Sequence, residues 1–329
     1  VRRFLEESGN YFPEIETAAN NFGVELGSQH NVSRLHLMTL HLEQRYGVRT
    51  QIMPQKVMGN LFREFDPHRS RLLLSENLQE PQRIFQVAAQ IALIGYRDII
   101  DQVINRVQLQ DDAATLLRIT LSGYFAGAVM MPYTEFLAAA QETRYDLELL
   151  CNRFVANFEQ VCHRLTTLNK SNERGIPFFF LRVDEAGYIS KRLSAGGIEF
   201  ARNGGACSRW IPHQAFRNPG QIMTQASCLE EGQKLLTITR THNIPRTQPA
   251  HYGAPIYAIA LGCDLKFAKE IGYTDQLINL KEPSLTPIGL GCHICERQNC
   301  QQRGALPRGQ KLRFDISKRY SGLFDSLRS

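Results

Sequence analysis

The chain has 329 residues, of which 43% are hydrophobic and 21% charged, and its formal net charge is +6. This length allows one large or two ordinary domains with substantial cores, and it excludes the small secreted domains that depend on disulfides. The charge is mild and no Lys/Arg run is interleaved with aromatic residues, so composition gives no argument for nucleic-acid binding by this chain.

The sequence lacks the features of a secreted or membrane-spanning chain. Its N-terminus is charged rather than a signal peptide, and the longest apolar run, 119–133, contains two glycines and a proline. Such a run is too short to span a bilayer. Five cysteines are scattered without regular spacing, as in a reducing compartment. We therefore expect a soluble, cytoplasmic protein. Because residue 1 is Val rather than Met, we also expect an N-terminal portion to be missing from the sequence.

Up to about residue 168 the pattern predicts a mostly helical region. Apolar residues recur at intervals of three and four, as a buried helix face requires. Residues 71–75 favour a short edge strand, and Asp146 is placed to interact with the N-terminal dipole of the last helix. The expected helices cover 32–46, a long segment that opens at Glu80-Pro81, 116–131, 135–141 and 147–168.

A polar segment at 169–177 ends this helical region, and the residues that follow it have the sequence pattern of β-strands. Residues 178–184 and 188–192, joined by a charged turn that ends in Gly187, predict a β-hairpin. Further strands are expected over 221–226, 234–241 and 255–261. By analogy, a mostly antiparallel sheet with a few short helices is typical of small-molecule sensor modules of the PAS or GAF type.

Three of the eight cysteines, Cys292, Cys295 and Cys300, fall within nine residues. Thiolates this close can turn onto one metal centre, and they select zinc or an iron–sulfur cluster because both prefer sulfur to oxygen. No second Cys-x-x-Cys completes a mononuclear zinc site, so a [4Fe–4S] cluster with one further ligand fits at least as well. Three reduced, buried cysteines without metal remain the alternative.

The fourth ligand of such a centre has two candidates. Cys207, in Gly-Gly-Ala-Cys-Ser-Arg-Trp, lies close to the only tryptophan and is the better one, against the alternative of a small buried core residue. His293 lies between two of the clustered thiols, where the geometry of the ring beside Cys292 is awkward.

The helix from Pro81 and the segment 123–133 resemble the two core segments of ImmA/IrrE-type zinc metallopeptidases. In that family the first helix carries His-Glu-x-x-His, which supplies two zinc ligands and the general base. Here Ala89, Gln90 and Leu93 occupy those positions. Without imidazoles and a carboxylate there is no site for catalytic zinc. We therefore expect a peptidase scaffold without peptidase activity.

Taken together, the segments resemble the short-chain fatty acyl regulator family of bacterial transcription factors over nearly the whole chain. The most specific motif is Cys292-x-x-Cys295-x-Arg-x-x-Cys300-x-x-Arg303. Other matching segments are Phe-Gln-Val-Ala-Ala-Gln at 85–90, Tyr-Phe-Ala-Gly-Ala at 124–128, Arg-Tyr-Asp-Leu-Glu at 144–148, Glu-Gln-Val-Cys-His-Arg-Leu at 159–165 and Pro-Phe-Phe-Phe-Leu-Arg-Val-Asp at 177–184.

The expected fold is α+β, in four parts. A linker or helix over 1–30 follows a missing DNA-binding domain, and a mostly helical, degenerate metallopeptidase-like domain covers 31–170. A PAS/GAF-like antiparallel-sheet domain covers 171–280. A cysteine-rich metal segment and tail complete the chain over 281–329.

The resemblance implies that this chain is the ligand-sensing portion of a regulator of short-chain fatty acid metabolism genes, and not an enzyme. Its expected cofactor is a [4Fe–4S] cluster on Cys292, Cys295, Cys300 and Cys207, and its expected ligand is a short-chain acyl-CoA such as propionyl-CoA. DNA would be bound only through the missing helix-turn-helix domain, no membrane contact is expected, and helix-turn-helix regulators commonly form homodimers.

A CoA thioester presents phosphates, an adenine and a short apolar chain, which call for Arg or Lys, an aromatic face and a small apolar pocket. We expect this pocket between the former peptidase cleft and its neighbours. Arg45 and Arg71 would contact phosphates, and Tyr124 would lie near the pantetheine or acyl end. Arg182 and Lys191 are further candidates from the strand region.

Three other functions are weighed against this one. An active zinc peptidase is disfavoured by the lost His-Glu-x-x-His motif. An iron–sulfur redox enzyme would use the cysteine cluster catalytically, but no substrate or flavin motif supports it. A structural zinc-binding interaction protein would use the same three cysteines without sensing a ligand.

Overall fold

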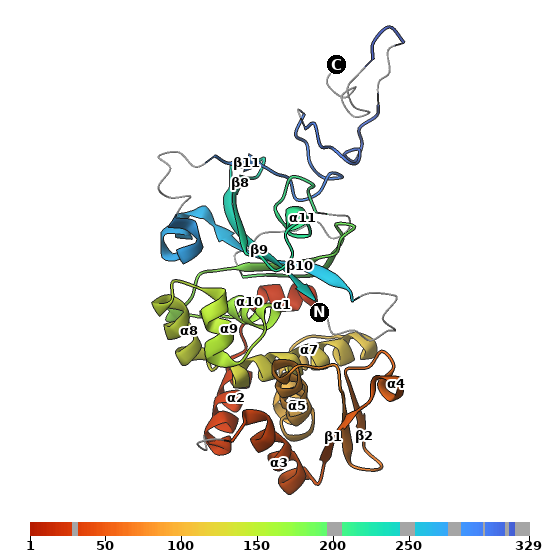
Figure 1. The fold of residues 1–329 in the computed structure, drawn as a ribbon, viewed down its shortest axis with the longest axis vertical. Coiled ribbons are helices and arrows are strands. Elements are labelled where there is room, and N and C mark those ends of the chain that lie inside the picture. Colours follow the sequence, from red (N-terminus) through yellow and green to blue (C-terminus); the bar gives the residue numbers. More distant parts are fainter. Residues whose placement is uncertain are drawn as a thin grey trace. The chain divides into compact units, whose positions relative to one another are not determined.

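The computed structural model describes residues 1–27, 32–195, 206–243, 254–275, 284–298, 300–312 and 316–319. The chain forms two compact units (Figure 1). Val1–Gly175 make up nearly all of the first, helical unit, and the second, sheet unit contains Ile176–Asn243 and the chain from Ile256 onward. The division between the units falls inside the polar segment 169–177, where the sequence predicts a break.

The helical unit confirms the expected helices, apart from the last one. Two helices, α1 and α2, lie in the N-terminal part that was expected as a linker or helix. The helices are α1 (Arg2–Glu7), α2 (Pro13–Leu26), α3 (Arg34–Tyr46), α4 (Gln55–Met58), α5 (Glu80–Gly95), α6 (Arg97–Ile104), α7 (Asp111–Met130), α8 (Tyr133–Glu142), α9 (Leu147–Phe154) and α10 (Phe158–Leu165).

The prediction of one helix over 147–168 is wrong, because the chain breaks between α9 and α10. Val155 has a left-handed backbone with φ 49°, which ends α9. Asn157 then accepts a hydrogen bond from the Gln160 amide at 2.9 Å, and the Gln160 side chain accepts one from the Asn157 amide at 2.8 Å. This capping box starts a new helix where apolar periodicity alone continues the old one. Asp146 caps α9 as expected, accepting from the amide of Glu148.

A three-stranded sheet completes this unit, and it corrects the prediction of an edge strand at 71–75. The strands β1 (Arg49–Met53), β2 (Arg63–Asp66) and β3 (Arg71–Ser75) lie in the order β1-β3-β2, so β3 is central. It pairs parallel with β1 and antiparallel with β2. Both flanking strands are short and largely polar, so their sequences carry no strand periodicity. A two-stranded ribbon of β4 (Asn169–Lys170) and β5 (Glu173–Arg174) ends the unit.

The core of the helical unit forms where α5 and α2 pack along α7 (Figure 1). Phe22 of α2 and Phe125 of α7 are fully buried, with ring centroids 6.0 Å apart. In the described part of the chain, α7 is the one helix long and apolar enough to cross a membrane, judged by length and composition, and half of its apolar window is buried in this core.

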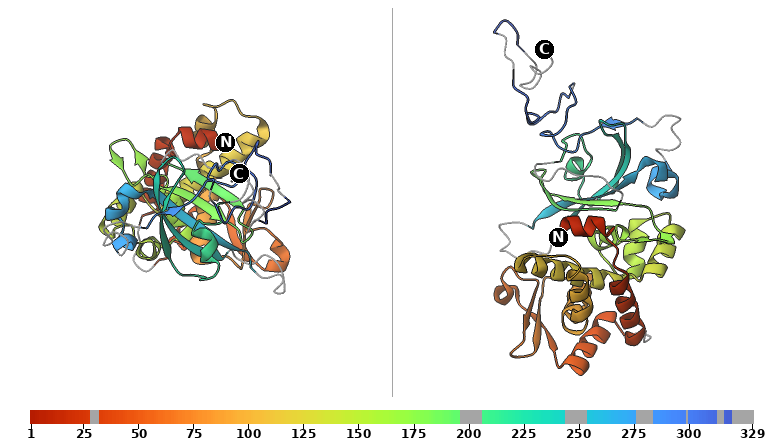
Figure 2. Two further views of the ribbon diagram at one scale, coloured as in Figure 1. Left: turned by 90° about the horizontal axis from the view of Figure 1, so that it is seen from above. Right: turned by 180° about the vertical axis from the view of Figure 1, so that it is seen from behind.

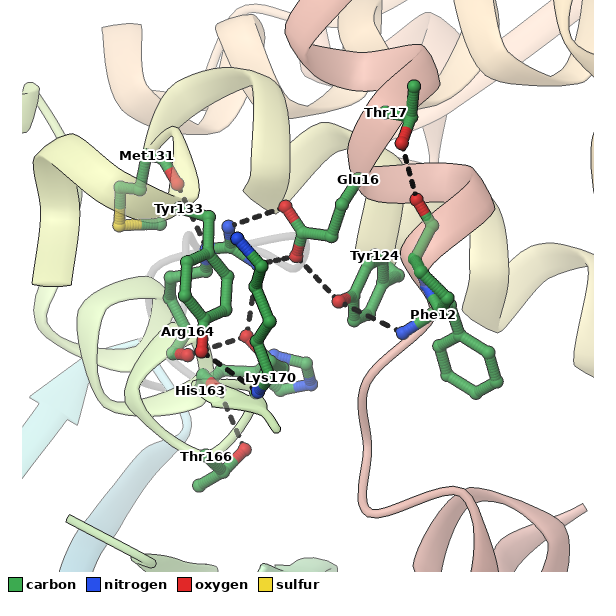
Figure 3. Close-up of polar contacts among 12 residues, drawn as sticks. Phe12, Glu16, Thr17, Tyr124, Met131, Tyr133, His163, Arg164, Thr166 and Lys170 are labelled. Carbon is green, nitrogen blue, oxygen red and sulfur yellow. Dashed lines mark hydrogen bonds and ion pairs between the residues drawn. The ribbon is translucent and has the colours of Figure 1, made fainter. Parts of the chain in front are cut away.

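A buried ion pair joins α2 to α10 (Figure 3). Arg164, 2% exposed, donates to the two carboxylate oxygens of Glu16 at 2.6 and 2.9 Å. The Tyr124 hydroxyl donates to the same carboxylate at 2.6 Å and accepts from the amide of Phe12. Burial opposes the charge on Arg164, but Glu16 raises its pKa above the ordinary value. Burial, and then the charge of Glu16, raise the pKa of Tyr124 well above its usual range.

The sheet unit contains one six-stranded sheet, which confirms the predicted hairpin and later strands. The order is β11-β8-β9-β10-β6-β7, antiparallel except that β11 pairs parallel with β8. Figure 2 shows the sheet from two further sides. The strands are β6 (Phe179–Val183), β7 (Ile189–Ser194), β8 (Met223–Cys228), β9 (Lys234–Asn243), β10 (Ile256–Asp264) and β11 (Thr286–Pro287).

One face of this sheet is covered by α11 (Pro212–Ala215) and by Trp210, which belong to one hydrophobic cluster with Phe179. The indole N–H of Trp210 donates to the Thr237 hydroxyl of β9 at 2.9 Å. Two 3-10 helices, η2 (Leu265–Glu270) and η3 (Gly272–Thr274), follow β10. From Ile288 onward the described residues form turns without helix or strand.

We expect Glu16→Gln to lower the free energy of unfolding by about 3–5 kcal/mol, because it leaves the buried Arg164 charge without its counter-ion. Urea unfolding followed by circular dichroism measures this loss. Glu43→Gln is the control: it breaks the exposed pair with Arg49 and should cost less than about 1 kcal/mol. Equal losses for the two variants would contradict the importance of the buried pair.

His41 should make the helical unit less stable in acid. Its ring lies 5.1 Å from the ring of Phe22, its Nε2 is buried without a hydrogen-bond partner, and burial lowers its pKa. The unfolded chain therefore binds a proton on His41 at higher pH than the folded chain does. As a result, the free energy of unfolding has its full value above the ordinary histidine pKa and decreases as the pH falls below it. His41→Phe should flatten the fall in thermal midpoint between pH 7 and pH 5; an unchanged slope would assign that fall to other groups.

Candidate functional site

Four cysteines from two distant segments line one small cavity in the sheet unit. Cys207 comes from the loop before α11, and Cys292, Cys295 and Cys300 come from the segment after β11. The cavity that they line has a volume of about 10 Å³. Cys207 and Cys295 are buried and the other two are half-buried. The structure therefore brings together all four cysteines that the sequence singles out.

His293 lies differently from the four thiols. It is exposed and does not line the cavity, and its Nδ1 is 3.3 Å from the carbonyl oxygen of Leu306. Its position between two of the cysteines in the sequence therefore does not bring it into the cavity that they line.

Backbone pairing at the edge of the sheet positions the cysteine segment. β11 pairs with β8, and the Ile288 amide donates to the Cys228 carbonyl at 3.0 Å. The Ser208 hydroxyl, next to Cys207, donates to the Gln302 carbonyl at 2.9 Å. The two cysteine-bearing segments are thus tied to each other directly as well as through the sheet.

Arg303 holds the cysteine segment in shape. Its guanidinium is buried and donates to the carbonyl oxygens of Cys295, at 3.2 Å, of Cys292, at 3.5 Å, and of Arg297. Arg297 in turn donates to the carbonyls of Cys228 and Ile288, both at 3.4 Å. A segment without helix or strand must satisfy its buried carbonyls with side chains, and these two arginines do so.

The sulfur atoms have close polar neighbours. The Gly304 amide donates to the Cys292 sulfur at 3.4 Å, and the Cys295 thiol donates to the Glu230 carboxylate at 3.3 Å. Burial is the main cause that raises the pKa of the Cys295 thiol, and Glu230 adds to it. A side chain at Gly289 would place its Cβ 2.9 Å from the Cys295 sulfur, so this approach requires glycine.

The charges around the cavity fit an anionic, sulfur-ligated group. Arg209, Arg297 and Arg303 line it together with the four thiols, and no carboxylate does, since Glu230 contacts Cys295 from outside the lining. The spacing of the ligands is a separate point. In the described residues no three His, Cys, Asp or Glu side chains are grouped closely enough to hold a single metal ion. Sulfur ligands of one zinc ion lie about 3.8 Å apart, and an iron–sulfur cluster, being larger, takes its thiolates from wider spacing.

The positions of the peptidase motif lie in the helix core. Ala89 and Gln90 are buried in α5, and Leu93 is half-buried. On the facing helix the Ser122 hydroxyl donates to the Ile119 carbonyl of its own turn at 2.8 Å. Core-packing residues thus occupy the positions of the two imidazoles and the carboxylate that zinc-catalysed hydrolysis requires.

The residues predicted to contact CoA lie in separate places. Arg45, at the end of α3, and Arg71, at the start of β3, are exposed. Tyr124 is buried, with its hydroxyl engaged by Glu16. In the sheet unit, Arg182 and Lys191 are register partners on the β6–β7 hairpin, where Arg182 stacks over a tyrosine ring and Lys191 over a phenylalanine ring. A shared role in ligand binding stays a prediction for these five residues.

The helical unit also contains an apolar groove that was not predicted from the sequence. Its volume is about 650 Å³, and Ile84, Met130, Ala138 and Phe154 supply apolar lining. Arg34 lies at its edge and donates to the Val129 and Met130 carbonyls at the end of α7, at 3.2 and 3.1 Å. The lining residues of the groove come from α3, α5, α7, α8 and α9. Because they are distributed over five helices, no single segment of the sequence predicts the groove.

The helical and sheet units match two different family models. Residues 43–166 match the IrrE N-terminal-like domain, and residues 167–324 match the C-terminal domain of the short-chain fatty acyl coenzyme A regulators. A solved structure titled Mycobacterium tuberculosis transcriptional regulator superposes with a TM-score of 0.88 at 35% identity, covering 97% of this chain and 96% of that one.

Curated relatives are named as regulators, not enzymes. The HTH-type transcriptional regulator PrpR of Mycobacterium tuberculosis is 37% identical over 319 residues, 96% of this chain and 64% of that protein. The propionyl-CoA carboxylase regulator of Cereibacter sphaeroides is 38% identical over 97% of this chain and 67% of its own length. The chain thus spans about two-thirds of these relatives, and it belongs to the short-chain fatty acyl coenzyme A regulator family of transcriptional regulators.

Proposed function

We propose that this chain is the ligand-sensing portion of a cytoplasmic transcriptional regulator, which binds a short-chain acyl-CoA and carries a [4Fe–4S] cluster on Cys207, Cys292, Cys295 and Cys300. The observation that carries the proposal is the single cavity lined by these four thiols and three guanidinium groups. Cys207 comes from a segment distant in sequence from the other three cysteines, and their meeting at one cavity favours a shared ligand.

The thiols, a backbone amide and the arginines at the cavity would each interact with such a cluster in a different way. When bound, the cluster supplies a redox-sensitive crosslink between the Cys207 loop and the C-terminal segment. The thiols hold it, and the Gly304 amide, which donates to the Cys292 sulfur, withdraws charge from that ligand. The arginines compensate the negative charge of four thiolates, which would be costly to bury alone.

The groove beside α8 suits the acyl end of the ligand. Its volume falls in the range of small-molecule pockets, and its lining is mostly apolar. The charged residues along it are two arginines and three glutamates, a balance that disfavours the CoA phosphates there. Arg45 and Arg71 remain our candidates for phosphate contacts. The Arg34 side chain, held by the α7 carbonyls, gives the groove a rigid polar edge.

Signalling requires that acyl-CoA bind one arrangement of the regulator more tightly than another, because a ligand shifts an equilibrium only by its difference in affinity. DNA recognition would belong to a helix-turn-helix domain outside this sequence. A homodimer that reads two half-sites is the arrangement we expect for the complete protein.

Iron and sulfide analysis tests the cluster. The anaerobically purified chain should contain about four irons and four sulfides. Cys207→Ser and Cys292→Ser should each lower the iron content by half or more, because each removes a ligand. Cys228→Ser is the matched control: Cys228 lies in the same unit outside the cavity lining and should keep full iron. One zinc per chain, or iron lost equally from all three variants, would contradict the assignment.

Calorimetry tests the acyl-binding groove. We expect propionyl-CoA to bind more tightly than CoA, and Ala138→Trp to weaken propionyl-CoA at least tenfold by filling the groove from an exposed helix position. Gln44→Trp, at an exposed position of α3 outside the groove lining, is the control and should bind normally. Normal binding by Ala138→Trp would place the acyl chain elsewhere.

A further inference from the structure

A second cavity of about 310 Å³ adjoins the cysteine cavity in the sheet unit. Arg209 and Gln302 line both cavities. Arg217, which follows α11, and Thr286 of β11 line only the second one. Both cysteine-bearing segments therefore contribute to the second cavity, through Arg209 and Gln302, and α11 and β8 supply further lining.

The lining of this second cavity is cationic and rich in hydrogen-bond donors. Arg209 and Arg217 supply two guanidinium groups, and no Asp or Glu is among the lining residues. Within the described part of the chain neither arginine forms an ion pair. Ser208 and Thr286 add hydroxyls. Two unneutralised guanidinium groups at one concave site favour an anion with several acceptor oxygens.

The backbone that carries Arg209 is held rigidly. The Gln225 side chain of β8 donates to the Arg209 carbonyl at 3.1 Å and accepts from the Ile211 amide at 3.0 Å. Between them Trp210 is fully buried and hydrogen-bonded to Thr237. The position of the Arg209 backbone is therefore set before any ligand arrives, which lowers the entropy cost of binding.

We propose that this cavity binds a phosphate dianion, either free phosphate or a small phosphate monoester. The planar fork of each arginine matches phosphate oxygens, and the cavity is large enough for the anion with a small substituent. This site depends neither on acyl-CoA binding nor on the identity of the metal centre.

Binding there is coupled to the cysteine cavity. A phosphate that contacts Arg209 and Gln302 holds the Cys207 loop against the cysteine segment, adding to the existing bond from the Ser208 hydroxyl to the Gln302 carbonyl. Because coupling between two sites is reciprocal, phosphate should slow the opening of the cysteine cavity, and closure of that cavity should tighten phosphate binding.

Titration of the full chain with inorganic phosphate, followed by ³¹P NMR at constant ionic strength in chloride, tests the site. We expect saturable binding that Arg217→Gln weakens at least tenfold and Arg209→Gln also weakens. Arg308→Gln removes an exposed arginine outside the cavity lining and should bind like the wild type. No saturable binding, or equal binding by Arg217→Gln and Arg308→Gln, overturns the proposal.

Two further measurements complete the test. Glycerol 3-phosphate as a second probe distinguishes the sources: tighter binding than inorganic phosphate identifies a monoester site, and weaker binding a free-phosphate site. The rate of cysteine modification by a disulfide reagent should fall at least threefold in saturating phosphate for wild type and Arg308→Gln, but not for Arg217→Gln. Unchanged rates in wild type would overturn the coupling. Neither readout requires acyl-CoA or iron, so failure here is distinguishable from failure of the proposed function.

Discussion

The function-bearing part of this molecule depends on how its chain satisfies one buried guanidinium. Arg303 lies in a segment with no helix or strand among its described residues, and it donates to three carbonyl oxygens of the turn that carries Cys292 and Cys295. The hydrogen bonds give this irregular turn a defined shape. They leave the positive charge itself uncompensated, because a carbonyl is a dipole and not a counter-ion.

A comparison with Arg164 shows why this matters. Both guanidinium groups are buried, but Arg164 meets the carboxylate of Glu16 at hydrogen-bond distance, whereas in the described residues Arg303 forms no ion pair. The charged residues that line the cavity with Arg303 are Arg209 and Arg297. The lining groups able to become negative are the four cysteines, and the Glu230 carboxylate contacts Cys295 from outside the lining. Arg303 is buried, and Arg209 and Arg297 are half-buried. A buried positive charge is tolerated when an anionic centre accompanies it, and four thiolates on an iron–sulfur cluster would provide one. The charges of the lining residues thus support the proposed cluster, as does the spacing of the cysteines.

Sequence reasoning succeeded where a local pattern has one structural meaning. Apolar periodicity located α3, α5 and α7, and the charged turn ending in Gly187 located the β6–β7 hairpin. It failed at Val155, where the apolar stripe continues through a left-handed residue, and at β1 and β2, whose polar strands gain their place only by pairing with β3. The apolar groove was missed for a related reason: periodicity reports which face of a helix is buried, and not where five helices meet.

Among the site residues, Cys207 illustrates what neighbours in sequence can reveal. Its position close to the only tryptophan made it the better candidate for a fourth ligand. The structure packs it in one hydrophobic cluster with Trp210 and brings it to the cavity of the other three cysteines. The five residues expected to contact CoA were chosen by residue type alone, and residue type says nothing of which surfaces face one another. Tyr124 shows the consequence, since its hydroxyl is already engaged by Glu16 and by the Phe12 amide.

X-ray absorption spectroscopy of the anaerobically purified wild-type chain tests the central claim most directly. The account predicts iron with a first shell of sulfur only and a short iron–iron distance, and a changed iron first shell in Cys207→Ser. Zinc in a mononuclear site, or iron whose first shell is unaffected by the loss of Cys207, would contradict it.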